Sequence, residues 1–377
     1  MPGAPAPGDA VPSPAVQDPV APTARAPRLF GLLARRRRAA AAPAERLVFR
    51  WDLDKTYLLS EFESLREMMK IPFEKPEDKI AAPGVAALIR GLRESALSRG
   101  RTVRIYFLSA SPPQIGRAIR RKLELDGIVY DGIVFKDQLQ RLFRGKFRHL
   151  REQVGYKLTE LLKGRSVEPA AAREYLFGDD WESDPLIYSL YADVAAGRVA
   201  PGDLAELLRH ARADPPLIEE ARQLAIALPK GEAVARIFIN LERPTPPAAL
   251  RIYGARLVPT FNYFQSAACL FQDDVLSVDG VVRVARALVE ESNYQGVQLE
   301  NSLADVVRRG HVSADSATAL RRALGRAGLL PPFARTFAER LRAAWRRAAR
   351  PITLDATAAR VDYHAIVSGQ TAEAAAE

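Results

Sequence analysis

Apolar runs and amphipathic segments alternate along the middle of the chain. Short runs rich in β-branched and aromatic residues predict strands, at residues 46–52, 102–108, 127–135, 173–177 and 234–240. Apolar positions at helical spacing predict helices around and between them, at residues 61–70, 84–99, 113–125 and 146–163. Strands that alternate with helices are typical of a layered fold built on a parallel sheet. We therefore predict an α/β protein with a Rossmann-like parallel sheet.

Two further stretches contain helical patterns only. Between residues 186 and 230 the pattern is broken at Pro201, Pro215 and Pro216, which predicts a helical insertion before the strand at 234–240. From residue 279 onward the pattern is helical again. The predicted parts are a disordered tail at 1–44, an α/β core at 45–185, the insertion at 186–230, the end of the core at 231–278, a C-terminal helical region at 279–350 and a flexible tail at 351–377.

Composition narrows the class of protein. The first residues are rich in Pro and Ala and lack the basic region and apolar core of a signal peptide, so we expect a disordered tail. A single cysteine, Cys269, excludes an internal disulfide and a zinc cluster of thiolates, and it suits a reducing compartment. No stretch approaches the ~18–20 apolar residues of a membrane span. We therefore expect a cytoplasmic protein.

The net charge of +10 favours anionic partners such as phosphates, nucleic acid or an acidic membrane surface. Two segments, 28–38 and 332–350, combine several arginines with aromatic and aliphatic residues. Basic amphipathic segments of this kind can lie on anionic membranes, so peripheral membrane contact is one expectation. The alternatives are a solvated tail for the first segment and a stripe that packs on the core for the second.

Acidic and hydroxyl side chains follow three of the predicted strands. Asp52 and Asp54 follow the first, Ser109 follows the second, and Asp179 follows the strand at 173–177, with Asp180 and Asp184 close behind. Ligands of open parallel sheets bind beyond the carboxyl ends of the strands. Carboxylates are ligands that Mg²⁺ prefers, and a carboxylate can also attack phosphorus. The pattern therefore predicts a site that binds Mg²⁺ and reacts with a phosphoryl group.

These residues resemble the motifs of the haloacid dehalogenase (HAD) superfamily. Residues 52–56 match its DxDxT motif, Ser109 matches the hydroxyl residue after its second strand, and the segment GDDWESD matches its acidic fourth motif. The resemblance implies that Asp52 is the nucleophile and that Asp54 is the general acid and base. It implies Mg²⁺ ligands at Asp52, Asp54, Asp179 and Asp184, with Asp180 as an alternative to Asp184. An acid at position 54 is what marks the phosphatases of that superfamily.

The same resemblance implies phosphate binding by Thr56, Ser109 and a lysine of the third motif. Lys157 is the favoured lysine, because it precedes Gly178 by about twenty residues, where that motif often falls. Lys146 and Lys136 lie in the same window and remain alternatives. Each of the three could instead be a solvated lysine on a helix.

A closer resemblance, over about residues 46–280, is to the actin-patch phosphatidate phosphatase family. It is carried by FLSASPPQI, GIVYDGIVFKD and GDDWESDPLIY, and the chain departs from it at Lys55, Pro113 and Trp181. The resemblance implies hydrolysis of phosphatidate to diacylglycerol. The alternatives are another phosphoester, such as a small molecule, phosphoprotein or nucleic-acid end, and a non-catalytic HAD-like binding protein.

Other features carry less chemistry. Nucleic acid is not the expected partner, because the sequence contains no base-reading motif or stacking platform. The sequence does not indicate which protein, if any, the helical regions bind. The four histidines, His149, His210, His311 and His364, show no metal-ligand spacing and are expected to be structural. Trp181 and Tyr188 flank the acidic motif, where they could shape the mouth of a pocket or simply pack.

Overall fold

A computed structural model of the chain describes residues 45–54, 56–58, 81–109, 116–135, 146–181, 183–330 and 361–368. Several expectations lie outside these residues: the tail at 1–44, the helix at 61–70, the basic segments at 28–38 and 332–350, and the departures at Lys55 and Pro113. In the part that is described, no helix is both long enough and apolar enough to cross a membrane.

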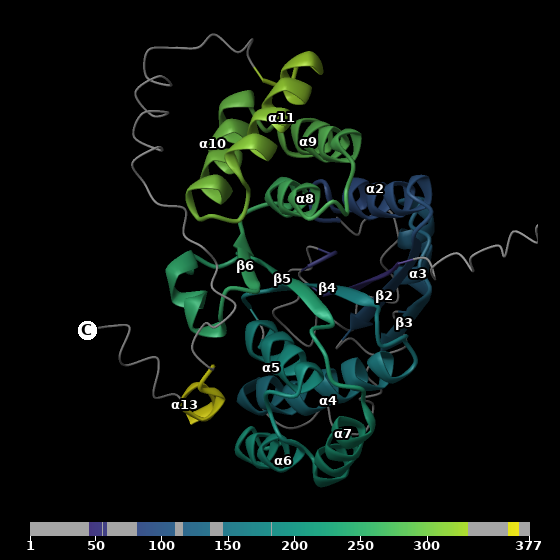
Figure 1. Cartoon of the computed structure of the whole chain (residues 1–377), viewed down its shortest axis with the longest axis vertical. Coiled ribbons are helices and arrows are strands. Elements are labelled where there is room, and N and C mark those ends of the chain that lie inside the picture. The colour runs from purple at the N-terminus through teal and green to yellow at the C-terminus, as the bar shows by residue number, and fades with distance from the viewer. Residues whose placement is uncertain are drawn as a thin grey trace, which may run out of the picture. The chain divides into compact units, whose positions relative to one another are not determined.

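The described strands form a six-stranded, entirely parallel sheet, which confirms the predicted α/β class (Figure 1). The strands are β1 (Arg46–Asp52), β2 (Thr102–Ser109), β3 (Gly132–Phe135), β4 (Arg173–Asp179), β5 (Val234–Asn240) and β6 (Leu257–Thr260). Their order across the sheet is β3-β2-β1-β4-β5-β6. The order reverses between β1 and β4, so the crevice for a ligand is expected at the carboxyl ends of these two central strands.

Two strand predictions needed correction. The run at 127–135 forms a strand only over its last four residues, and β6 was not predicted at all. β6 has four residues, one of which is Pro259, and a proline cannot donate a hydrogen bond to a neighbouring strand. Proline is tolerated there because β6 is the edge strand of the sheet.

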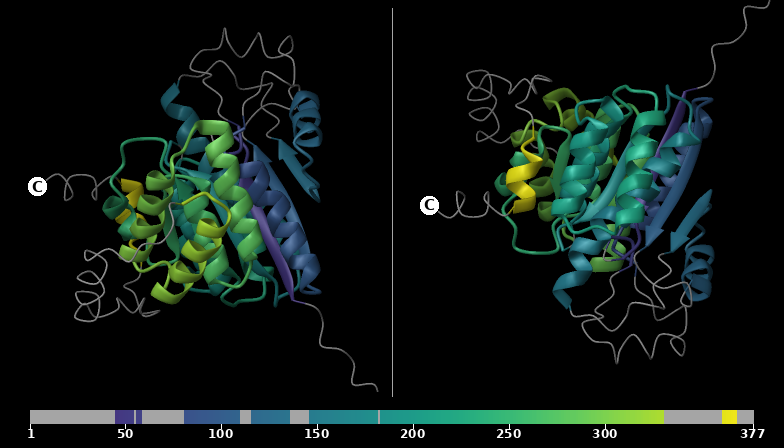
Figure 2. Two further views of the ribbon diagram at one scale, coloured as in Figure 1. Left: turned by 90° about the horizontal axis from the view of Figure 1, so that it is seen from above. Right: turned by 90° about the horizontal axis from the view of Figure 1, so that it is seen from below.

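Helices cover both faces of the sheet (Figure 2). One face carries α2 (Val85–Ser98), α3 (Gly116–Leu125), α8 (Tyr263–Gln272), α9 (Val278–Ser292), α10 (Gly296–Arg308) and α11 (Ala314–Arg326). The other carries α4 (Lys146–Ser166), α5 (Asp184–Ala196), α6 (Pro201–His210), α7 (Pro215–Ala227), the 3₁₀ helix η4 (Pro247–Tyr253) and α13 (Tyr363–Ser368).

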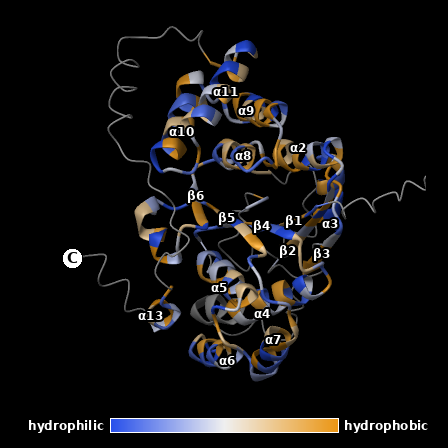
Figure 3. Ribbon diagram, in the orientation of Figure 1, coloured by the Kyte–Doolittle hydropathy of each residue, from blue (hydrophilic) through white to orange (hydrophobic). Residues whose placement is uncertain are grey.

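The helices bury an apolar stripe and expose the rest of their surface. In α9, Val281, Val284 and Leu288 are buried at helical spacing. Figure 3 shows that the helices which cover the sheet also carry hydrophilic residues. Residues of β1 divide between the two faces of the sheet, because side chains alternate along a strand. Phe49 and Trp51 join the core of one face, whereas Arg50 points to the other.

An aromatic stack and a buried ion cluster fix the two central strands against each other. Trp51 of β1 stacks on Phe177 of β4, with ring centroids 3.7 Å apart and planes 3° from parallel. On the opposite face Arg50 Nε donates to Glu174 Oε2 at 2.9 Å. Arg165 and Tyr191 also donate to the Glu174 carboxylate, which is fully buried.

Glu174→Gln should therefore destabilise the fold strongly. Burial alone would raise the pKa of the Glu174 carboxyl, but the guanidinium of Arg50 offsets this and holds the pKa below its ordinary value. This stabilisation is present above the ordinary carboxyl pKa and is lost on acidification. The neutral amide would leave two buried guanidinium groups uncompensated, at a cost of about 3–5 kcal/mol.

Urea unfolding at neutral pH measures this loss. Glu219 forms an ion pair with Arg222 at the surface, so Glu219→Gln is a matched control. It also replaces a paired carboxylate by an amide, but it should change the free energy of unfolding little. Equal stability of the two variants would contradict the assignment of Glu174 as the centre of the cluster.

Candidate active site

Three neighbouring strands end at the residues that the sequence singled out. β1 ends at Asp52, β2 at Ser109 and β4 at Asp179, and β1 lies between the other two. Beyond β1 the chain turns tightly, because the Leu53 carbonyl accepts hydrogen bonds from the amides of both Tyr57 and Leu58. The turn keeps the residues of the first motif at the edge of the sheet.

Asp54 and Ser109 meet across the ends of β1 and β2. Ser109 Oγ donates to Asp54 Oδ2 at 2.8 Å. Ser109 is fully buried, whereas Asp54 is half-buried. Asp54 is therefore held in one position while keeping access to solvent, which suits a group that exchanges protons with a substrate.

Three buried carboxylates form the centre of the site. Asp52, Asp179 and Asp184 are each 0% exposed, and one carboxylate oxygen of each lies within 4.8 Å of the others. Lys157 Nζ lies 2.8 Å from Asp52 Oδ1 and 2.8 Å from Asp184 Oδ1. These four side chains carry a formal charge of −2 when ionised. A buried group of this charge and donor type could hold a divalent metal ion.

Asp184 is positioned by its helix and by a glycine. It lies in the first turn of α5, where the positive end of the helix dipole favours a carboxylate. A Cβ atom on Gly178 would overlap Asp184 Oδ2 and would lie 2.8 Å from the ring of Tyr188. A side chain at position 178 would therefore displace Asp184 from the other two carboxylates.

Asp179 is oriented by its neighbours. The amide of Trp181 donates to Asp179 Oδ1 at 2.7 Å, and Thr56 Oγ1 donates to Asp179 Oδ2 at 3.4 Å. The hydroxyl of Tyr263 in turn donates to the Thr56 carbonyl at 2.5 Å, so a residue of α8 supports the first motif. Thr56 thus contacts a carboxylate of the centre, and its implied contact with a phosphate stays a prediction.

Among the described side chains, Lys157 is the candidate lysine that reaches the carboxylates. It is fully buried on α4, although lysine is seldom buried without a partner. Lys146 begins the same helix, about 16 Å earlier along its axis at 1.5 Å per residue, and its side chain lies outside the described residues. Lys136 lies outside them as well.

Asp180 serves a different purpose from its neighbours. Its carboxylate accepts hydrogen bonds from the amides of Glu242 and Arg243, at 2.8 and 3.1 Å, and so holds the loop that follows β5. It is not one of the three clustered carboxylates. Successive side chains point to opposite sides of an extended chain, which explains why adjacent aspartates reach different places.

Trp181 and Tyr188 have different surroundings. Tyr188 is almost fully buried, and its hydroxyl lies 3.3 Å from the Phe177 carbonyl, so this side chain packs. Trp181 is half-buried, and the guanidinium of the exposed Arg243 lies 4.3 Å from its ring centroid. Arg243, which lies three residues after the strand at 234–240, was not singled out from the sequence.

Comparison with known proteins adds little to this geometry. No protein-family model matches the chain, and no curated protein matches it. One solved structure, of the Pnkp1/Rnl/Hen1 RNA repair complex, aligns with 36% of this chain and 36% of that chain, at 16% identity and a TM-score of 0.24. An alignment of this length and score assigns neither family nor function.

The fold and the site together define a class of protein. The chain is an α/β protein with a six-stranded parallel sheet, and the carboxyl ends of its central strands bring together three buried aspartates that could hold a metal ion.

Proposed function

We propose that the protein is a Mg²⁺-dependent phosphomonoester hydrolase of the HAD type that works through an aspartyl-phosphate on Asp52. The observation that carries the proposal is the buried cluster of Asp52, Asp179 and Asp184, bridged by Lys157. The separately held Asp54, bonded to Ser109, supports it. A nucleophile, an acid-base group, a cation and a hydroxyl are the parts that such a reaction needs.

The first half of the reaction transfers the phosphoryl group to the protein. An oxygen of Asp52 attacks phosphorus, a new oxygen–phosphorus bond forms, and the bond to the leaving oxygen breaks. Asp54 gives its proton to that leaving oxygen, which departs as an alcohol. Lys157 and Ser109 hold phosphoryl oxygens and balance their negative charge. A Mg²⁺ ion held by Asp52, Asp179 and Asp184 would supply electrostatic stabilisation of the transferring group.

The second half returns the protein to its starting state. Asp54, now ionised, takes a proton from a water molecule, and the resulting hydroxide attacks the phosphorus of the aspartyl-phosphate. The bond between Asp52 and phosphorus breaks, and inorganic phosphate leaves. Asp54 ends the cycle protonated and Asp52 ionised, as they began.

Phosphatidate is the substrate that the resemblance of residues 46–280 favours, and a soluble phosphomonoester and a 3′-phosphorylated oligonucleotide are the alternatives. Phosphate release from all three should be measured with Mg²⁺ and with EDTA. We expect release from at least one substrate and a loss of about 100-fold or more in EDTA. Release that EDTA leaves unchanged, or no release from any of the three by the folded protein, would contradict the proposal.

A further inference from the structure

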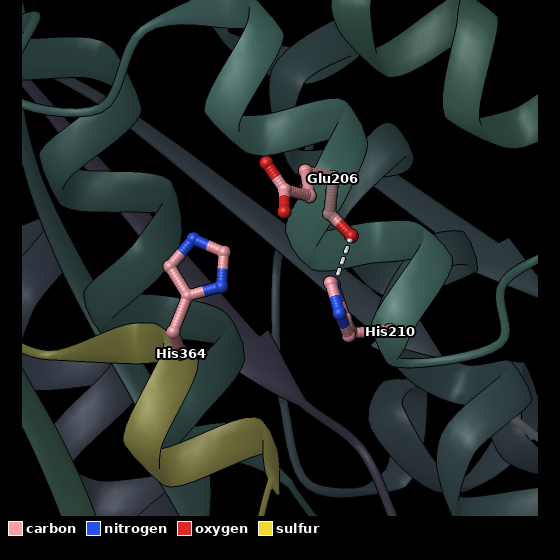
Figure 4. Close-up of side chains that lie close together, drawn as sticks. All are labelled: Glu206, His210 and His364. Atoms are coloured by element: carbon pink, nitrogen blue, oxygen red, sulfur yellow. Dashed lines mark hydrogen bonds between the residues drawn. The ribbon is translucent and has the colours of Figure 1, made fainter.

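The structure brings together two histidines that lie far apart in the sequence. Glu206 and His210 lie on α6, and His364 lies on α13, about 150 residues later (Figure 4). One potential ligand atom of each lies within 4.8 Å of the others, and all three side chains are exposed. The imidazole rings of His210 and His364 meet edge to face, with centroids 5.8 Å apart. The sequence shows no metal-ligand spacing for the histidines, whereas the fold brings this pair together.

We infer that Glu206, His210 and His364 form a second metal site, which binds a transition-metal ion such as Zn²⁺. It shares no residue with the buried aspartate cluster. Its donors also differ in kind, because two imidazoles and a carboxylate suit Zn²⁺, whereas a set of carboxylates alone suits Mg²⁺. Three protein ligands leave a fourth position open to water or another ligand.

The hydrogen bonding of His210 prepares it to bind a metal. Its Nδ1 lies 3.0 Å from the main-chain carbonyl oxygen of Glu206, as the dashed line in Figure 4 marks. A carbonyl oxygen can only accept, so the neutral ring carries its proton on Nδ1 and has its lone pair on Nε2. Metal-bound histidines commonly donate their other ring N–H to a carbonyl oxygen in this way.

The spacing of the ligands fits one ion after a small adjustment. Glu206 and His210 are four residues apart and therefore lie on the same face of α6. Two atoms that each lie about 2.1 Å from an ion are at most about 4.2 Å apart. All three side chains are exposed, so rotation of the Glu206 and His364 side chains can close the remaining gap.

The third ligand is held near the others by its neighbour in the chain. Tyr363 is 5% exposed, and its hydroxyl donates to Asp193 Oδ2 of α5 at 2.6 Å. This contact docks α13 on the body of the protein and fixes the position from which His364 extends. A metal ion bound here would link α13 to α6 and stabilise the docking of α13 on the rest of the protein.

Zinc titration of the full chain, with any purification tag removed and with excess Mg²⁺ to occupy the aspartate cluster, tests the proposal. We expect one Zn²⁺ per chain by calorimetry, and binding at least about tenfold weaker in His210→Ala and in His364→Ala. Arg209→Ala, at an exposed position next to His210, is the matched control and should bind as the unaltered protein does.

A spectroscopic readout identifies the ligands directly. Cu²⁺ bound to the unaltered protein should show magnetic coupling to two imidazole nitrogens, and each histidine variant should show coupling to one. Asp52→Asn should leave this spectrum unchanged, because the aspartate cluster contains no imidazole. Equal Zn²⁺ binding by the unaltered protein and both histidine variants, or no binding by the folded protein, would overturn the proposal. Circular dichroism confirms that each variant is folded.

Discussion

Asp52→Asn is expected to reduce phosphate release by roughly 10⁴-fold or more, because an amide cannot take the place of the attacking carboxylate. The replacement has the same shape as aspartate, so the fully buried site should keep its packing. Steady-state rates measure the loss, and thermal unfolding shows that the variant is folded. Activity within threefold of the unaltered protein would exclude Asp52 as the nucleophile.

Asp54→Asn provides the matched comparison, because it removes the proton donor and keeps the nucleophile. With a leaving group that needs no proton, such as p-nitrophenolate, the first half of the reaction should continue. Hydrolysis of the aspartyl-phosphate should slow, since no base activates the water molecule. Phosphate should then accumulate on the protein and be recovered on the peptide that contains Asp52. Accumulation on another residue would contradict the assignment of the two aspartates.

Lys157→Met should lose both stability and activity. Methionine has a similar length but no charge, so Asp52 and Asp184 would lose the ammonium that bridges them at 2.8 Å. Removing one partner from a buried charge cluster costs about 3–5 kcal/mol. Loss of the donor to the phosphoryl group should reduce turnover by about 10²–10³-fold.

Two further measurements test whether the loss of stability and turnover in Lys157→Met comes from the ammonium group of Lys157. Mg²⁺ should recover part of the lost stability in Lys157→Met, because a cation would again balance the carboxylates. Lys146→Met changes the other candidate lysine on the same helix and should leave turnover close to that of the unaltered protein. If Lys146→Met were the more damaging change, the assignment of Lys157 would be wrong. Calorimetry and phosphate release measure the two effects separately.

The centre of the candidate site was predictable because it depends on a general property of parallel sheets. Each of the residues Asp52, Ser109 and Asp179 ends a strand, and strands of this kind present their carboxyl ends to one edge. The role of Asp180 was not predictable, because the sequence does not show toward which side of the loop a carboxylate turns. The structure assigns it to the loop after β5.

The pairing of His210 with His364 could not be predicted for a different reason. It depends on where α13 docks, and α13 docks through long-range contacts such as that of Tyr363 with Asp193, which no local pattern shows. β6 escaped prediction because four residues with a proline carry too little of the period-two signal. Site residues could thus be predicted where they follow the strands of a regular parallel sheet. They could not be predicted where segments distant in the sequence meet.

The pairing of β1 with β4 has a consequence for how the protein is made. Leu47 lies opposite Arg173, so two central strands of the sheet are far apart in sequence, and contacts of this kind slow folding. At a synthesis rate of about 5–20 residues per second, roughly 7–26 s separate the addition of Asp52 from that of Asp184. During that interval the first aspartate exists without the partners that define its chemistry. The nascent protein should therefore acquire its acidic centre late, only after β4 and α5 have been synthesised.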